Sequence, residues 1–191
     1  NDDEAQVFVQ SAAVTKARLR EVRRKIGFLF QDPDDQLFMP TVGEDIAFGP
    51  YNMGLRGEEL NRVVDEALTQ VGMLEFKDRP PHHLSFGQRR RVAVATVLAM
   101  KPEILVMDEP SSNLDPASRR ELADIVRSLD VTIVMVTHDL DTLAATCDRI
   151  AVLSDGKVLA IGPLDEVRKN PNPWIQEYFS GPRGRAAVRQ D

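Results

Sequence analysis

Two continuous apolar runs, at residues 104–107 and 131–136, constrain the fold of this chain more than any other feature. Both runs are rich in β-branched residues and do not alternate with charged side chains, a pattern of strands covered on both faces, as in parallel sheets. Residues 116–129 lie between them and predict a crossover helix, with Pro116 suited to its first turn. A strand, a helix and a strand in this order predict an α/β fold with a mostly parallel sheet flanked by helices.

The remaining elements follow from the same kind of pattern. Apolar residues at helical spacing predict helices, short apolar runs predict strands, and an Asp-Gly pair predicts a tight hairpin turn. We therefore expect a strand at 26–30, helices at 58–71 and 86–100, and a hairpin at 150–161, with Gly72 at a helix C-cap.

The composition limits which classes of protein this chain can belong to. Its 191 residues, 42% of them hydrophobic, suffice for the core of one domain. A net charge of −6 argues against a nucleic-acid partner, whose binding surface would be basic. The single cysteine, Cys147, excludes a disulfide framework. No apolar stretch approaches the length of a transmembrane helix, and the N-terminal segment 1–4, with three acidic residues, is not a signal peptide. A membrane role would therefore require partner subunits.

Asp108 and Glu109 directly follow the apolar run 104–107, at the predicted carboxyl end of a strand. Ligands of open α/β sheets bind at this end of the strands. Asp108 could hold Mg²⁺ there, directly or through water. Glu109 could orient or deprotonate an attacking water, an effect worth about 10²–10⁴-fold. Taken alone, the same residues could form a polar strand end that opens a turn.

Ser85 precedes the helix predicted at 86–100, and Gln88 stands three positions later. One interpretation is a capping box, in which each of these side chains bonds to the other residue's backbone N–H. The other is an anion site, because a helix start offers unpaired N–H groups and the positive end of its dipole. Gly87 would let the backbone approach a phosphate closely, and the arginines at 89–91 would raise the local positive potential.

The run Leu84-Ser85-Phe86-Gly87-Gln88 resembles the signature motif of ABC transporter ATP-binding subunits, usually Leu-Ser-Gly-Gly-Gln, with Phe86 in place of the first glycine. In that family the motif binds ATP held by the opposite subunit. The resemblance implies a P-loop NTPase-like ABC ATPase fold with a helical signature subdomain. It also implies ATP and Mg²⁺ as cofactors, a second ATPase subunit in a homo- or heterodimer, transmembrane permease subunits, and a place at the cytoplasmic face of the cell membrane.

Further motifs match the family in the expected order: residues 104–108 resemble Walker B, 112–115 the D-loop, His138 the switch histidine and Gln31 the Q-loop glutamine. The resemblance implies catalysis by Glu109 and His138, metal binding by Asp108 and Gln31, and nucleotide binding by Ser85, Phe86, Gly87, Gln88, Asp115 and Gln31. On its own, His138 would be a polar residue at a strand end, and its neighbours Thr137 and Asp139 could cap a helix. Gln31 alone would carry no signal.

No phosphate-binding loop of the form G-x-x-x-x-G-K-[ST] occurs in the 191 residues. Of the eleven glycines only Gly156 precedes a lysine, and there Ala151 replaces the first glycine and Val158 the Ser or Thr. In the family this loop lies well upstream of the Q-loop, and the chain does not begin with Met, so we expect the loop in an N-terminal portion outside this chain. Without it we expect no ATP hydrolysis by this chain alone, marginal stability and exposed apolar surface.

Residues 31–136 resemble cobalt/nickel and energy-coupling-factor importer ATPases most closely, whereas the segment from 137 onward resembles ATPases of Mla/Mce-type lipid transporters. A chimeric sequence and an unfamiliar subfamily are two explanations of this change. Because the Q-loop region faces the membrane partner in the family, we expect an importer of a metal ion (cobalt or nickel) or a vitamin. The alternatives are a lipid-transporter ATPase, a catalytically inactive half-site donor or interaction module, and a non-transport ABC ATPase.

The chain is expected to be one partial ABC ATPase domain over residues 1–191. Its helical region, with the Q-loop and the segment next to the signature, is expected at about 40–85. The core sheet, with Walker B, the D-loop and the switch histidine, is expected at about 103–162. C-terminal helices and a tail are expected at 163–191, and residues 182–191 are expected to be mobile because they have little to bury.

Overall fold

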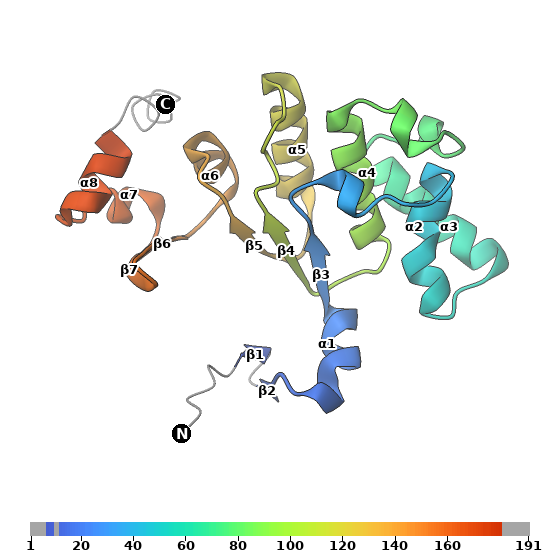
Figure 1. Cartoon of the computed structure of the whole chain (residues 1–191), viewed down its shortest axis with the longest axis horizontal. Helices are drawn as coiled ribbons and strands as arrows, with labels where there is room; N and C mark the ends of the chain where they lie inside the picture. The colour runs from blue at the N-terminus through green and yellow to red at the C-terminus, as the bar shows by residue number, and fades with distance from the viewer. Residues whose placement is uncertain (1–6, 10–11, 181–191) are drawn as a thin grey trace. The chain divides into compact units, whose positions relative to one another are not determined.

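The computed structural model describes residues 7–9 and 12–180 and divides into two units (Figure 1). The first unit comprises Asn1–Asn113 and Leu129–Val136, and the second comprises Leu114–Ser128 and Thr137–Asp191. The tail at 182–191, which we expected to be mobile, lies outside the described residues. The signature run and the acidic strand end both belong to the first unit.

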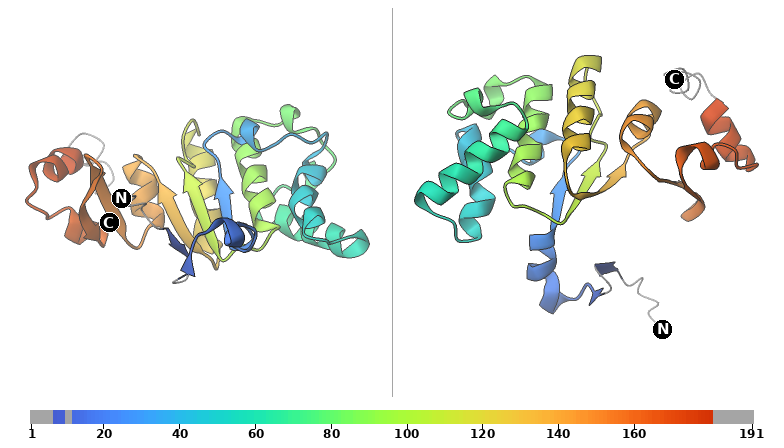
Figure 2. Two further views of the ribbon diagram at one scale, coloured as in Figure 1. Left: turned by 60° about the horizontal axis from the view of Figure 1, so that its bottom comes forward. Right: turned by 180° about the vertical axis from the view of Figure 1, so that it is seen from behind.

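A three-stranded sheet forms the centre of the first unit, in the order β3 (Ile26–Leu29), β4 (Ile104–Asp108) and β5 (Thr132–Val136). Both pairings are parallel, and Phe28, Val106 and Val134 occupy one row across the sheet. Figure 2 shows these strands from two further sides. The prediction of parallel strands at these positions is confirmed.

The two faces of this sheet differ in burial. Leu29, Leu105 and Met107 are fully buried on one face. On the other face the side chains of Phe28, Val134 and Val136 are 43%, 50% and 58% exposed. The prediction of strands covered on both faces is therefore wrong for this second face, because a continuous apolar run does not reveal which face has a neighbour. The apolar surface that we expected is found here.

The buried face packs against α4 (Phe86–Leu98) at Gly27 of β3. A Cβ atom at Gly27 would overlap Val97 Cγ1 and would lie 3.1 Å from Pro102 Cγ. Strand and helix can therefore approach this closely only because residue 27 lacks a side chain.

Gly27→Ala is expected to lower the free energy of unfolding by about 1–3 kcal/mol, because the added methyl group overpacks this contact. Urea unfolding followed by circular dichroism would measure the loss. Phe28→Leu, one residue away on the exposed face, is the control and is expected to change stability by less than about 1 kcal/mol. Equal losses in the two variants would contradict this assignment of the faces.

Three helices of the first unit, α2 (Val42–Asn52), α3 (Gly57–Gln70) and α4, pack together (Figure 1). The predictions of α3 and α4 are confirmed to within two residues at each end, and Gly72 follows the C-cap of α3 with a φ of 65°. Helix α2 was not predicted, because Gly49 and Pro50 make its sequence an unfavourable helix former. A signal was nevertheless present, since Thr41 and Glu44 form a capping box at its start.

Asp45 of α2 is a buried carboxylate that holds the chain before the helix. Its Oδ1 accepts hydrogen bonds from the backbone N–H groups of Phe38 and Met39, at 2.9 and 3.0 Å. Its Oδ2 is buried without a hydrogen-bond partner among the described residues. Burial raises the pKa of the Asp45 carboxyl, and the two N–H groups oppose that rise.

Asp45 is expected to make the protein less stable as the pH rises. Because its pKa is raised on folding, the folded protein binds the proton more tightly than the unfolded chain does. The free energy of unfolding therefore falls from the unfolded pKa, about 3.9, up to the folded pKa, and this contribution is constant above that. Urea titrations from pH 4 to 7 should show a steeper decline for the wild type than for Asp45→Asn. Parallel declines would contradict this role of Asp45.

The second unit contains the helices α5 (Pro116–Ser128), α6 (Leu140–Thr146), α7 (Leu164–Val167) and α8 (Pro173–Ser180), and an antiparallel hairpin of β6 (Ile150–Ser154) and β7 (Lys157–Gly162). The predicted crossover helix and hairpin are confirmed, and Asp155 and Gly156 both have positive φ at the turn, as a type I′ turn requires. A small core joins the hairpin to α7 and α8 through Ile150, Val167 and Ile175.

The N-terminal part of the first unit holds short elements that were not predicted. These are β1 (Phe8–Val9), which pairs antiparallel with β2 (Ala12–Ala13), and helix α1 (Leu19–Lys25) before β3. Among residues 7–9 and 12–180, no helix has the length and apolar character needed to span a membrane.

Candidate functional site

The acidic strand end lies where β4 leaves the sheet. Asp108 is the last residue of β4 and pairs with Val136 of β5, and the Glu109 backbone N–H donates to the Val136 carbonyl at 2.8 Å. Glu109 has a φ of 43°, in the left-handed region that a side chain disfavours. Such strain costs about 1–3 kcal/mol and occurs preferentially at functional sites. Ser112 contacts the Glu109 carboxylate, with Oγ and Oε2 3.4 Å apart.

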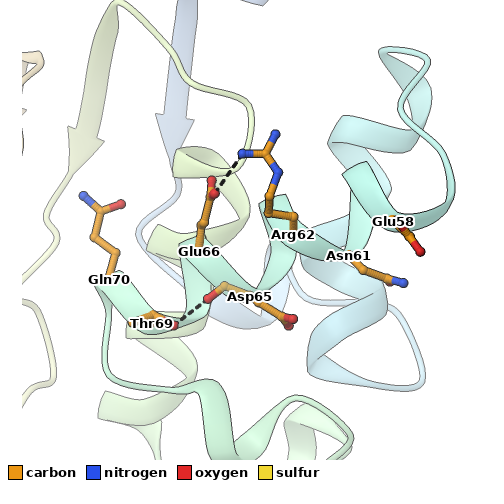
Figure 3. Close-up of a pocket in the computed structure, with 7 residues that line it drawn as sticks. All are labelled: Glu58, Asn61, Arg62, Asp65, Glu66, Thr69 and Gln70. Atoms are coloured by element: carbon orange, nitrogen blue, oxygen red, sulfur yellow. Dashed lines mark hydrogen bonds and ion pairs between the residues drawn. The ribbon is translucent and has the colours of Figure 1, made fainter.

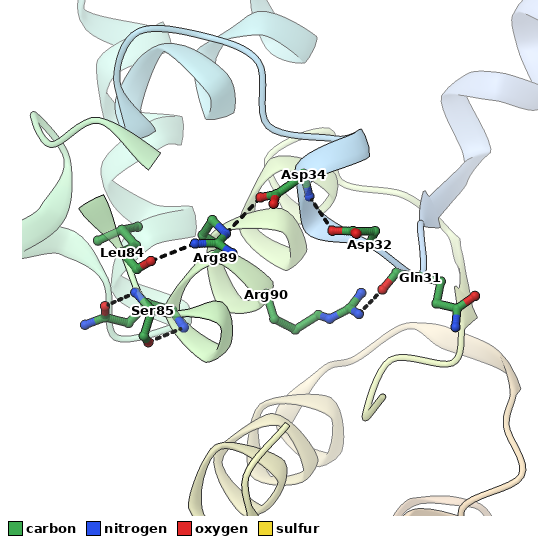
Figure 4. A network of polar contacts seen from close by, with 8 residues as sticks. Gln31, Asp32, Asp34, Leu84, Ser85, Arg89 and Arg90 are labelled. Carbon is green, nitrogen blue, oxygen red and sulfur yellow. Dashed lines mark hydrogen bonds and ion pairs between the residues drawn. The ribbon is translucent and has the colours of Figure 1, made fainter. Parts of the chain in front are cut away.

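Gln31 lies at the same edge of the sheet as this acidic pair. It follows β3 by two residues, and β3 runs parallel to β4, so the carboxyl ends of the two strands lie side by side. The Gln31 side chain is exposed and points away from Arg90, whereas its backbone carbonyl accepts a hydrogen bond from the Arg90 guanidinium (Figure 4). The structure thus brings Gln31, Asp108 and Glu109 to one edge.

The signature run forms the start of α4. Ser85 is the N-cap: its Oγ accepts from the Gln88 N–H at 3.2 Å, and its own N–H donates to Gln88 Oε1 at 2.9 Å. The predicted capping box is therefore confirmed. This geometry is equally suited to an anion, because the first N–H groups of a helix have no intrahelical partner. The Phe86 ring lies 5.7 Å from the guanidinium carbon of Arg90, within the range of a cation–π contact.

Two arginines of α4 reach the segment that follows β3 (Figure 4). Arg89 Nε lies 2.8 Å from Asp34 Oδ1, and Arg89 also donates to the Leu84 carbonyl. Arg90 is fully buried and donates to the carbonyls of Phe30 and Gln31. Burial lowers the pKa of Arg90, and the nearby charge of Asp32 opposes this. The Arg90 guanidinium is therefore directed to backbone carbonyls about sixty positions earlier in the sequence, and its effect on the potential at the helix start stays a prediction.

Asp115 and His138 belong to the second unit. Asp115 is exposed and lies just before α5, where it accepts hydrogen bonds from the Ala117 N–H and from the N–H and hydroxyl of Ser118. The Ser118 hydroxyl and these N–H groups lower the pKa of Asp115. A helix-capping position for this aspartate could have been recognised from its place directly before Pro116.

The His138 side chain is exposed, and its backbone carbonyl accepts a hydrogen bond from the Tyr178 hydroxyl at 3.1 Å. Its neighbour Asp139 caps α6 by accepting from the Asp141 N–H, so the predicted cap after β5 is confirmed. No local pattern points to Tyr178, because its partner lies forty positions away.

A pocket on the surface of α3 (Figure 3) contains no predicted site residue; it is lined by Glu58, Asn61, Arg62, Asp65, Glu66, Thr69 and Gln70. All these residues lie on one helix, and Arg62 pairs with Glu66 at 3.1 Å. Asp65 pairs with Lys77 at 2.7 Å, and we interpret this pocket as a solvated helix face.

A parallel sheet with an acidic strand end, preceded in the sequence by a capped helix start of anion-binding geometry, is the arrangement expected of an ABC ATPase fold. The solved structure of cbiO1 from Clostridium perfringens, described as part of the ABC transporter complex cbiONQ, is similar to this chain with a TM-score of 0.79 and 38% identity, over 85% of this chain and 67% of that one. The family model described as ABC transporter matches residues 1–112. This chain belongs to the ABC transporter family of ATP-binding domains.

Curated relatives agree with this family. A Streptomyces coelicolor protein that carries the name of an ABC transporter ATP-binding protein is 69% identical over 157 residues, 82% of this chain and 60% of that protein. The energy-coupling factor transporter ATP-binding protein EcfA of Methanocaldococcus jannaschii is 48% identical over 155 residues, 80% of this chain and 56% of that protein. The chain thus spans only about three fifths of the length of these relatives.

Proposed function

We propose that this chain is part of the ATP-hydrolysing subunit of an ABC importer for a metal ion, cobalt or nickel, or for a vitamin. The proposal that the chain acts on ATP rests on one observation. The capped start of α4 and the acidic end of β4 belong to the same unit. The importer class is supported by the similarity to cbiO1 and to an energy-coupling factor ATPase. In this function the subunit lies at the cytoplasmic face of a membrane, against transmembrane permease subunits.

In this proposal, residues at the carboxyl edge of the sheet bind Mg²⁺ and orient the attacking water. Among the described residues no group of three His, Cys, Asp or Glu side chains could hold a metal ion alone. Asp108 and Gln31 nevertheless suit Mg²⁺, which takes one or two protein ligands and completes its shell with phosphate oxygens and water. Bound Mg²⁺ would neutralise charge on the phosphates. Glu109 would orient or deprotonate the attacking water, and His138 would contact the γ-phosphate.

The start of α4 would act on ATP that a second subunit holds. Ser85 and Gly87 would present the hydroxyl and N–H groups of a helix start to the phosphates, with Phe86 and Gln88 completing the motif. Asp115 would lie at the contact between the two subunits. Because the chain contains no phosphate loop, this contribution to the partner's ATP is the activity it can supply alone, as a half-site donor.

A mixed assay tests this function. A complete ABC ATPase subunit whose own signature sequence has been disabled by mutation would be combined with this chain, and phosphate release from Mg-ATP would be measured. We expect the wild-type chain to restore hydrolysis, because its α4 start replaces the disabled signature. Its Ser85→Ala variant should restore less. If no partner cassette regains hydrolysis and the two proteins do not associate in ATP, the proposed function is wrong.

A further inference from the structure

Arg90 is the largest fully buried side chain in the part of the chain that the structure describes, and its charge requires an explanation. The guanidinium donates to two main-chain carbonyls, those of Phe30 and Gln31, directly after β3. Its Nε is buried without a hydrogen-bond partner among residues 7–9 and 12–180. Taking a guanidinium out of water is costly, and neutral carbonyls compensate for this less well than a carboxylate would. An apolar residue would fill this position in α4 at lower cost if packing were its only role.

We propose that Arg90 is a positioning residue that fixes the backbone of Gln31 to α4. This inference rests on the proposed function, in which Gln31 contacts Mg²⁺ or water at the sheet edge and Ser85 at the start of α4 contacts the partner's ATP. The planar guanidinium presents several N–H donors in a fixed geometry, so it can hold two successive carbonyls at once. A lysine ammonium could not reproduce this arrangement.

Two further contacts hold the same segment along the length of α4. Arg89 pairs with Asp34 at 2.8 Å and also donates to the Leu84 carbonyl, next to Ser85. Towards the other end of the helix, Gln36 Nε2 donates to the Ala93 carbonyl at 2.8 Å and to Thr96 Oγ1 at 2.7 Å. The Gln36 Oε1 atom in turn accepts from the Phe30 N–H.

The segment 30–36 is therefore attached to α4 in two regions: the consecutive residues Arg89 and Arg90 hold it in the first turns, and the Gln36 amide holds it in the second half. Of these attachments only the one through Arg90 is fully buried. The Arg89–Asp34 pair, whose aspartate is exposed, is weakened by solvent and salt. A movement of Gln31 at the sheet edge is consequently transmitted to α4, whose first residues form the signature run. Arg90 would thereby make the chain's own site and its contribution to the partner's site respond together.

Amide hydrogen exchange of the full chain, read residue by residue, tests this role. The reporter amides are those of Asp35, Gln36 and Leu37, which donate to carbonyls inside the segment. In Arg90→Met we expect them to exchange about tenfold faster or more, because the carbonyls of Phe30 and Gln31 lose their donor. The amides inside α4 should change less than about threefold, since methionine fills the buried position. Arg90→Lys should give an intermediate acceleration.

Val92→Ala is the matched control, because Val92 is fully buried on the same helix but bonds to no residue of the segment. It should accelerate exchange within α4 at least as much as within the segment. If Arg90→Met accelerates both sets of amides equally, or leaves the segment unchanged, Arg90 is only a core residue and the inference is wrong. This measurement needs no nucleotide. Failure of the mixed ATPase assay with the wild-type chain would therefore overturn the proposed function without affecting this result.

Discussion

The 191-residue chain alone is expected to hydrolyse ATP no faster than its own Glu109→Gln variant. A phosphate loop supplies most contacts to the β- and γ-phosphates and a hydroxyl ligand to Mg²⁺, and no such loop occurs in this sequence. We expect turnover at least about 10³-fold below that of a complete ABC ATPase, since the loss of a single phosphate or oxyanion donor already costs about 10²–10³-fold. Phosphate release at saturating Mg-ATP would measure it.

Glu109→Gln is a suitable baseline because glutamine has the length of glutamate and the same Cβ, so the backbone with its φ of 43° need not change. Only the charge and the capacity to accept a proton are lost. A complete ABC ATPase, measured with and without the matching Glu→Gln substitution, shows how much turnover this change removes from an active enzyme. Turnover by the wild-type chain clearly above its Glu109→Gln variant would show that these residues bind ATP without a phosphate loop.

Gly87→Asp is expected to abolish the ability of this chain to restore hydrolysis in the mixed assay, by at least about 100-fold. Gly87 is buried in the first turn of α4, where a carboxylate would repel the partner's phosphates and would occupy the space they need. Gly87→Ala, which adds a methyl group without charge, should reduce the rate less. Comparison of the two variants separates the effect of charge repulsion from the effect of added side-chain volume.

Gly57→Asp is the matched control for this charge. Gly57 is the first residue of α3, and a Cβ there meets no atom within 4 Å. Its φ of 55° strains any side chain, but aspartate is among the residues that adopt this conformation most readily. Gly57→Asp therefore has the same net charge as Gly87→Asp, but its new carboxylate lies at the start of α3 and not of α4. Unfolding measurements would verify that both variants fold. Equal activity of Gly87→Asp and Gly57→Asp would show that the start of α4 does not act on nucleotide.

The elements that could be predicted are those with local causes. The strands around residues 104–107 and 131–136 follow from composition, the hairpin turn from an Asp-Gly pair, and the cap of α4 from the spacing of Ser85 and Gln88. Helix α2 escaped prediction because its glycines and proline oppose helix formation, and its packing on α3 and α4 overrides that preference.

The features that could not be predicted depend on residues far apart in the sequence. Three successive arginines follow the signature run, and nothing local distinguishes Arg90, the one whose partners at Phe30 and Gln31 lie about sixty positions away. The exposure of one face of the sheet could not be predicted for the same reason, since Phe28 and Val134 are as apolar as the buried residues beside them. Only the arrangement of neighbouring elements decides these cases.

At residue 109 the left-handed backbone favours glycine for stability, whereas the proposed chemistry requires the carboxylate of glutamate. Glycine adopts this conformation without penalty, so a library screened only for thermal resistance would favour Glu109→Gly. That substitution would discard the carboxylate that we propose as the proton acceptor at the sheet edge. Engineering of this domain for robustness should therefore keep residue 109 fixed, because improvement there would select for an inert protein.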